Sequence, residues 1–144
     1  MDILTSIDIA ANGMTAQRTR LNVISMNLAN ANTTRTANGG PYRQKTVIFE
    51  TVPATSFNEQ FLNALDRHLY SVKVTKIEDV PGDFKKIFDP AHPDADDKGY
   101  VYLPNVNLVQ EMVKMLNANR SFEANAAVVR AAKDMALKAL DIGR

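Results

Sequence analysis

Apolar side chains recur every three or four residues over a long stretch at each end of this 144-residue chain. At the N-terminal end, one heptad row is Ile7, Met14, Leu21 and Leu28, and a second is Ile3, Ala10, Gln17, Ile24 and Ala31. Sustained spacing of this kind predicts a helix over residues 3–31 whose narrow seam packs against another helix. The stripe is too thin to cover the flank of a globular domain.

The C-terminal end repeats the pattern from Asn105 to about Ile142, with Asn105 or Asn107 as the candidate N-cap. Its positions, again alternating by four and three, are Leu108, Met112, Met115, Asn119, Phe122, Ala126, Val129, Lys133, Ala136 and Leu140. At about 1.5 Å per residue, the two helices are on the order of 40 and 55 Å long. The interior of so small a chain has no room for them, so they pair along their length or find partners outside the chain.

Asparagine is frequent in both helices, although it is a weak helix former. The first helix contains Asn12, Asn22, Asn27 and Asn30, and the second contains Asn107, Asn117, Asn119 and Asn125. Two interpretations stay open. The amides set the register across helix interfaces, as a buried asparagine does in a coiled coil, or they are solvated helix surface.

The segment between the helices has a different composition, since all six prolines lie in residues 41–104. Side-chain patterns predict strands at residues 46–52 and 70–75, and two shorter strands at residues 84–88 and 100–103 around an acidic loop. A short amphipathic helix is predicted by the fourfold spacing of Phe57, Phe61, Leu65 and Leu69.

These patterns together predict a mainly α fold with a small β unit. Residues 1–36 form an N-terminal coiled-coil helix and an Asn-rich segment, residues 37–104 a small β-containing middle domain, and residues 105–144 a C-terminal coiled-coil helix. We expect the two long helices to pair with each other as a coiled coil.

Composition excludes several kinds of chemistry. The chain has no cysteine, which removes disulfides, Cys-ligated metals and thiol catalysis, and its formal net charge of +1 gives no field to attract nucleic acid. In the acidic loop at residues 92–99, an EF-hand alignment would put Lys98 among the metal ligands. No stretch has the pattern of a transmembrane helix or of a cleaved signal peptide. We therefore predict no catalysis, no cofactor and no metal site.

Several short motifs resemble those of one bacterial family. GMTAQR at residues 13–18 and LNVISMNLANANTTRT at residues 21–36 resemble the N-terminal signature of flagellar basal-body rod proteins. GGPYR at residues 39–43 and DPAHPDAD at residues 89–96 are similar to the proximal-rod members of that family. The C-terminal helix resembles the family in SFEAN at residues 121–125 and KALDIGR at residues 138–144.

The resemblance implies a structural protein of the proximal rod, a tubular drive shaft for flagellar motility. In that family the terminal helices pair as a coiled coil around a central channel, and the middle domain lies further out. The resemblance also implies export through the flagellar type III apparatus without a cleaved signal, and assembly in the periplasm. Implied partners are other rod proteins and copies of this chain, with the membrane (MS) ring and rod-junction proteins as further candidates.

The two helical seams are the expected assembly interface. Its candidate residues are Ile7, Met14, Leu21, Ile24, Leu28, Asn30, Leu108, Met112, Met115, Phe122, Val129 and Leu140. Under this hypothesis, Leu21→Asp or Leu28→Asp blocks assembly while the middle unit still folds, because each buries an unpaired charge. Two alternatives stay open: another axial protein of the distal-rod or hook type, and a soluble helical adaptor that binds partner helices in the cytoplasm.

Overall fold

The computed structural model describes residues 3–37, 39–54 and 69–142. In chain order, its elements are α1 (Ile3–Ala29), β1 (Lys45–Pro53), β2 (Tyr70–Asp79), β3 (Lys85–Phe88), β4 (Tyr100–Leu103) and α3 (Leu108–Ile142). The prediction of two long terminal helices with a small β-containing insert is therefore confirmed. Within the described ranges, neither helix is long and apolar enough to span a membrane.

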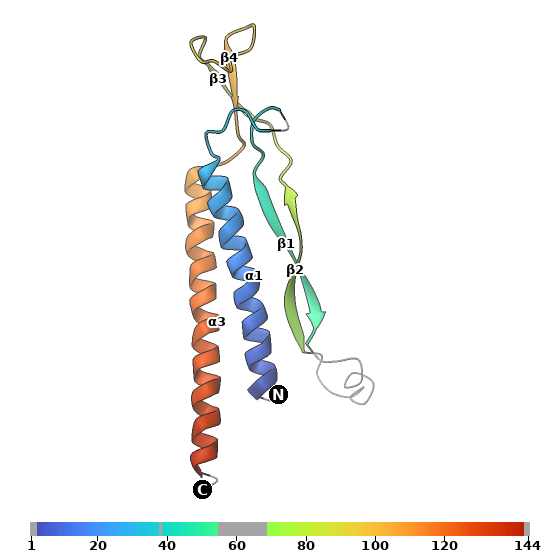
Figure 1. The fold of residues 1–144 in the computed structure, drawn as a ribbon, viewed down its shortest axis with the longest axis vertical. Coiled ribbons are helices and arrows are strands. Elements are labelled where there is room, and N and C mark those ends of the chain that lie inside the picture. The colour runs from blue at the N-terminus through green and yellow to red at the C-terminus, as the bar shows by residue number, and fades with distance from the viewer. Residues whose placement is uncertain (1–2, 38, 55–68, 143–144) are drawn as a thin grey trace.

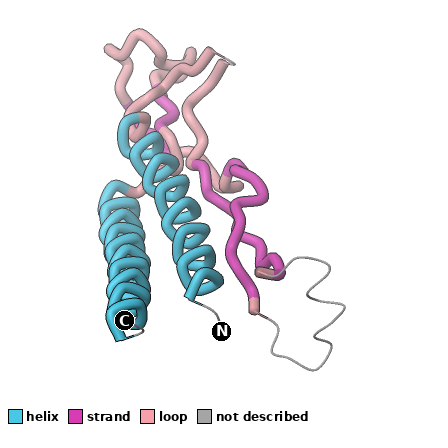
Figure 2. Tube along the Cα trace, turned by 60° about the horizontal axis from the view of Figure 1, so that its bottom comes forward, coloured by secondary structure: helices cyan, strands magenta, loops and turns pink. Residues whose placement is uncertain are grey.

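The molecule is built in three layers, with α1 between α3 and the β1–β2 hairpin (Figures 1 and 2). The helices α1 and α3 are antiparallel, and α1 contacts α3 on one side and both strands of the hairpin on the other. In addition to the predicted seam residues Ala10 and Ile24, the side chains of Ala16, Val23 and Asn27 are buried. The prediction of a single thin seam is therefore wrong for α1, because its small and polar side chains let a second layer approach.

Side-chain amides define the ends of both helices. Asn107 caps α3, since its Oδ1 accepts hydrogen bonds from the backbone N of Val109 at 3.1 Å and of Gln110 at 3.2 Å. At the end of α1, Asn30 Nδ2 donates to the carbonyl O of Met26 at 2.9 Å. Of the two N-cap candidates in the sequence, Asn107 is therefore the right one.

The strands form two separate antiparallel hairpins. The register of β1 with β2 runs from Lys45 opposite Asp79 to Pro53 opposite Tyr70. The shorter β3–β4 hairpin projects beyond the end of the helix pair (Figure 1). The four predicted strands are confirmed, and the first two are longer than predicted. The short helix predicted around Phe57 lies almost entirely outside the described residues.

The inner face of α3 matches only one of the two predicted rows. The buried or half-buried positions that alternate by four and three are Glu111, Met115, Ala118, Phe122, Asn125, Val129, Ala132 and Ala136. The row of Met115 and Phe122 is confirmed. Leu108, at the start of that row, is 52% exposed. In the other row, Met112 and Leu140 are 59% and 71% exposed. The inward positions there lie one residue earlier, at Glu111, Ala118, Asn125 and Ala132. The pattern favoured large apolar side chains, whereas the inner face alternates Met115, Phe122 and Val129 with alanines, Asn125 and the carboxylate of Glu111.

Small residues allow the two helices to approach closely at Gly13. A Cβ atom added to Gly13 would lie 2.9 Å from Asn125 Nδ2. A larger residue here would therefore displace the Asn125 amide from its present contact with α1.

Candidate assembly site

A buried polar network lies where the chain leaves α1, enters β1 and begins α3. Asn27 Nδ2 donates to the Lys45 carbonyl O and to Glu111 Oε2, both at 2.8 Å. Its Oδ1 accepts from the Tyr42 hydroxyl and from the Lys45 backbone N, both at 2.9 Å. These four bonds use every hydrogen-bonding position of the amide. One asparagine thus fixes three segments relative to one another.

The carboxylate of Glu111 is the charged centre of this network and is 1% exposed. Besides Asn27, it accepts hydrogen bonds at Oε1 from Gln44 Nε2 at 2.8 Å and from Lys114 Nζ at 2.6 Å. A buried charge is destabilising unless it is paired and hydrogen-bonded. Here an amide from α1, an amide from the segment before β1 and an ammonium from α3 meet both requirements.

A second amide ties the open end of the β1–β2 hairpin together. Asn105 Oδ1 accepts from the Gln44 backbone N at 2.9 Å, and its Nδ2 donates to the Val80 carbonyl O at 3.1 Å. Beside it, Lys45 Nζ pairs with Asp79 Oδ1 at 2.6 Å, and this hydrogen bond raises the pKa of Lys45. Asn105 therefore joins the strands instead of capping α3.

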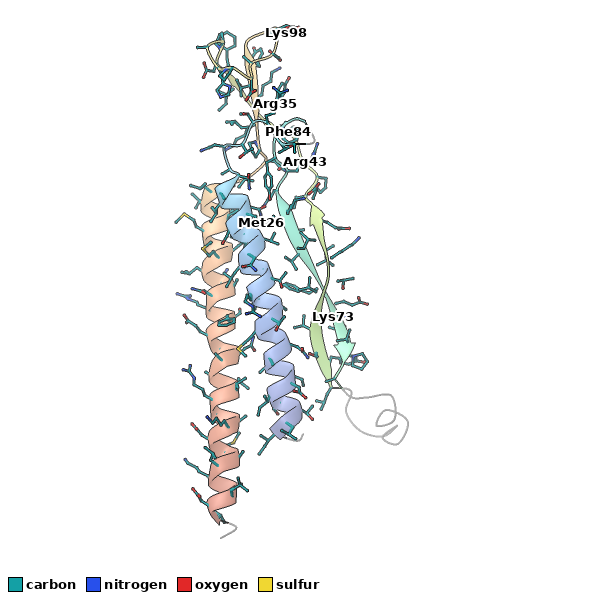
Figure 3. The ribbon with its side chains drawn as sticks, in the orientation of Figure 1. Met26, Arg35, Arg43, Lys73, Phe84 and Lys98 are labelled. Carbon is teal, nitrogen blue, oxygen red and sulfur yellow. The ribbon has the colours of Figure 1, made fainter. Side chains whose placement is uncertain are left out.

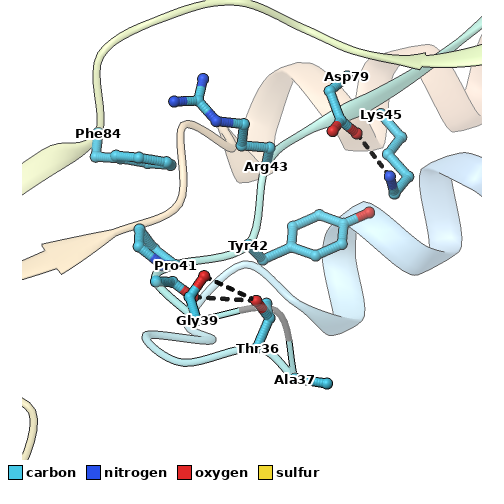
Figure 4. A pocket seen from close by; sticks show the side chains of 10 residues that line it. Thr36, Ala37, Gly39, Pro41, Tyr42, Arg43, Lys45, Asp79 and Phe84 are labelled. Carbon is cyan, nitrogen blue, oxygen red and sulfur yellow. Dashed lines mark hydrogen bonds and ion pairs between the residues drawn. The ribbon is translucent and has the colours of Figure 1, made fainter.

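The turn before β1 aims two neighbouring side chains in opposite directions. Gly39 and Gly40 have φ angles of +80° and +74°, a left-handed backbone that favours glycine, and the Thr36 hydroxyl donates to both of their carbonyl groups. Tyr42 then points toward α1 and Arg43 away from it (Figure 4). Burial raises the pKa of Tyr42, so its hydroxyl keeps the proton that it donates to Asn27.

The acidic loop between β3 and β4 is a hydrogen-bonded turn. Asp96 Oδ1 accepts from the backbone N of Tyr100 at 2.8 Å and of Lys98 at 2.9 Å, and these bonds lower the pKa of Asp96. Asp94 Oδ2 accepts from the Thr34 hydroxyl at 2.7 Å, which attaches the loop to the Asn-rich segment after α1. No group of side chains suited to a metal ion occurs in the described part of the chain.

The face of α3 opposite Glu111 carries an exposed apolar stripe. Val109, Met112, Val113 and Leu116 are 54–69% exposed. Their spacing of three, one and three residues places them on one side of the helix. Together they form a continuous apolar patch, and patches of this kind mark interaction sites. We call these four residues the outer stripe.

The C-terminal part of α3 is also without cover, because α3 extends past the start of α1 (Figure 1). Leu137, Leu140 and Ile142 are 51%, 71% and 86% exposed. The helix therefore offers apolar side chains to solvent near both of its ends.

The predicted interface residues fall into two groups. Buried or half-buried within the chain are Ile7, Met14, Leu21, Ile24, Leu28, Asn30, Met115, Phe122 and Val129. Leu108, Met112 and Leu140 offer most of their surface to solvent. The first group lies on the helix pair of one chain, and the second is open to a neighbouring molecule.

Sequence reasoning missed the polar network as a unit. Its one signal was the high frequency of asparagine, and both interpretations of that signal hold at different positions. Asn27 is buried and Asn125 is half-buried at contacts with other elements, whereas Asn12 and Asn117 are exposed. Nothing in the sequence marked Glu111 as a buried carboxylate.

Two family models match the two ends of the chain, and individual relatives match its whole length. Residues 7–35 match the family described as "Flagella basal body rod protein", and residues 97–142 match "Flagellar basal body rod FlgEFG protein C-terminal". The "Flagellar basal-body rod protein FlgC" of Borreliella burgdorferi is 46% identical over 99% of this chain and 98% of its own length. The chain belongs to the FlgC family of flagellar basal-body rod proteins. Members from Bacillus subtilis and Escherichia coli O6:H1 are 40% and 39% identical over the full length of both chains.

As a FlgC-family protein, the chain is a structural component of the flagellar rod. The resemblance found in the sequence is thereby confirmed, and the alternatives of a hook-type protein and a cytoplasmic adaptor are set aside. The two matched regions meet in the polar network, because Asn27 lies in the first and Glu111 in the second. The network thus joins the two family regions to each other.

Proposed function

We propose that this chain builds the proximal part of the flagellar rod by packing the outer face of α3 against neighbouring subunits. The observation that carries the proposal is the outer stripe, Val109, Met112, Val113 and Leu116, which is exposed on the side of α3 that faces away from α1. A rod subunit must bury its own apolar surface against the next subunit, and this stripe supplies that surface.

The energetics favour burial of the stripe on assembly. Full burial of a Val, Leu or Met side chain contributes about 1.5–3 kcal/mol. Four such side chains on one helix face make a substantial contribution against the loss of freedom on association. Contacts that join different surfaces of successive copies do not close, so they generate helical, tube-like assemblies. The sequence placed the assembly interface on the two helical seams. We propose that it lies instead on the outer face of α3, at Met112 and the other residues of the outer stripe.

The role is mechanical and not catalytic, with the subunit acting in a drive shaft for flagellar motility. We infer export through the flagellar type III apparatus without a cleaved signal, and assembly in the periplasm with other rod proteins and further copies of the chain. The MS ring and rod-junction proteins are additional candidate partners. The absence of cysteine is compatible with transit as an unfolded chain.

Purified basal bodies test this function. Detergent-extracted basal bodies, sheared free of filament and hook, are analysed by mass spectrometry for peptides of this chain. We expect the chain in the rod fraction, and we expect cells that lack it to form no complete rod. Recovery of the chain only from the cytosol would contradict the proposal.

A further inference from the structure

Two adjoining cavities flank the Gly40–Pro41 turn. One has a volume of about 540 Å³ and is lined by Arg43 and Phe84, among others (Figure 4). The other has a volume of about 350 Å³ and is lined by Arg35, among others. Gly40 and Pro41 line both cavities, and Figure 3 shows the two arginines in the region between the helices and the projecting hairpin. We call this region the arginine groove.

The arginine groove carries an excess of positive charge, because Arg35, Arg43 and Lys45 line its two cavities against Asp79 and Asp94. The Arg43 guanidinium lies 4.5 Å from the Phe84 ring centroid, and its Nη1 contacts the Gly82 carbonyl O at 3.5 Å. Among the described residues, no ion pair involves Arg35 or Arg43, and both are exposed. A guanidinium held on an aromatic ring is a common centre of protein interfaces, and it binds carboxylates well.

The β3–β4 hairpin projects from the molecule, and its first strand, β3, lacks cover. All four residues of β3 are exposed, including Phe88 at 64% and Ile87 at 48%. Among the described elements, the hairpin contacts neither helix and neither of the other two strands. A two-stranded hairpin alone is marginally stable in water. The apolar side chains of β3 are therefore available to a surface of another molecule.

The tip of this hairpin, residues 89–99, carries the opposite charge to the groove. It contains four aspartates and one lysine. Asp94 is held by Thr34 of the same chain, but Asp89 and Asp97 are exposed. Figure 3 shows Lys98 at the far end of the molecule, which places the tip away from the helices.

We propose that the hairpin tip of one copy docks in the arginine groove of the next copy, with its aspartates pairing with Arg35 and Arg43. The inference rests on the proposed function, because it requires copies of the chain to be neighbours in the rod. The same chain carries both complementary surfaces. Within one chain, Asp94 of the tip lines the groove. Asp89 and Asp97 of the same tip are exposed and are therefore available to the groove of another copy. Such a contact joins different surfaces and therefore propagates.

Cross-linking in intact basal bodies tests the contact. Because the chain has no cysteine, Ala37→Cys beside the groove and Lys98→Cys at the tip each introduce a single thiol and leave the arginines and aspartates in place. Cells expressing both variants, with different epitope tags, are treated with a bismaleimide after basal-body purification. We expect a dimer that carries both tags. The matched control replaces Lys98→Cys with Lys73→Cys, an exposed position on β2 far from the tip (Figure 3), and should give no such dimer.

The outcomes separate this inference from the proposed function. If both variants are present in the rod but no two-tag dimer forms, the docking contact is wrong and the rod function stands. Cross-linking of Ala37→Cys to a different protein also overturns the contact, since it assigns the groove to another partner. If the chain is absent from wild-type basal bodies, the proposed function itself fails.

A charge exchange provides a second test that does not depend on thiols. Arg43→Glu alone should lose swimming in soft agar, and Arg43→Glu combined with Asp97→Arg should recover it, because the exchanged charges attract again. Swimming of Arg43→Glu equal to the wild type would overturn the proposal. A double variant that swims no better than Arg43→Glu alone would overturn it as well.

Discussion

Asn27 and Glu111 determine the geometry of the junction between the helices and the β segment. The partners of Asn27 lie 18 and 84 residues further along the chain. Sequence periodicity could predict that asparagines matter in these helices, but it could not identify this one. Its role depends on atoms that only the folded chain brings together. For the same reason the sequence did not identify Glu111, because a charged residue in a helix is ordinarily expected at the surface.

Removal of the buried carboxylate should strongly destabilise the fold. Glu111→Leu removes the acceptor of Gln44 Nε2 and one of the two acceptors of Asn27 Nδ2, so we expect the free energy of unfolding to fall by about 2–4 kcal/mol. Glu111→Gln is the control. It keeps a carbonyl acceptor in a side chain of the same shape, so its free energy of unfolding should fall by less. Urea titration followed by far-UV circular dichroism measures both. A Leu variant as stable as the wild type would contradict the role of the network.

Tyr42 should make stability depend on pH in the alkaline range. Burial raises its pKa above the ordinary value of 10.0, so the unfolded chain loses this proton first. The stabilisation is complete below that value and is lost as pH rises through the folded-state pKa. Lys45, whose pKa is also raised, contributes in the same direction. Unfolding free energies from about pH 9 to about pH 11 should therefore fall less steeply in Tyr42→Phe. Identical slopes would rule out a contribution from Tyr42.

At the scale of elements, the sequence predicts the helices and strands well and their packing only in part. The heptad rows that contain Ile7 and Met115 are shielded as expected. The row of Met112 and Leu140 is not, and Leu108 at the start of the Met115 row is exposed as well. The approach of α3 to α1 depends on small residues, which hydrophobic patterns do not count. Gly13 against Asn125 is the clearest example of such a contact.

Filling the space at Gly13 should separate the helices. Gly13→Val places methyl groups where Asn125 Nδ2 now lies, so we expect a loss of about 1–3 kcal/mol in unfolding free energy. Adding Asn125→Ala should recover part of the loss by making room. The exposed neighbour Asn12→Val controls for the effect of valine on helix propensity. Thermal unfolding compares the four proteins, and a Gly13→Val variant as stable as Asn12→Val would refute the close contact.

At the scale of the whole molecule, the three-layer arrangement exposes one face of α3. The sequence already indicated that helices of this length pair along their length or find partners outside the chain. It could not place the β1–β2 hairpin along α1, because strand alternation does not say which helix face a hairpin covers. That hairpin covers α1, which leaves the outer stripe of α3 as the surface open to neighbouring subunits.

The most direct test compares two glutamate substitutions on α3. Val113→Glu puts a charge in the outer stripe, whereas Gln110→Glu puts the same charge on an exposed position beside it. Both purified proteins should unfold within about 0.5 kcal/mol of the wild type, because both sites face solvent in the single chain. The amount of each variant in purified basal bodies is then measured by quantitative mass spectrometry. We expect Gln110→Glu at the wild-type level and Val113→Glu to be lost from the rod, and equal incorporation of the two would contradict assembly through this face.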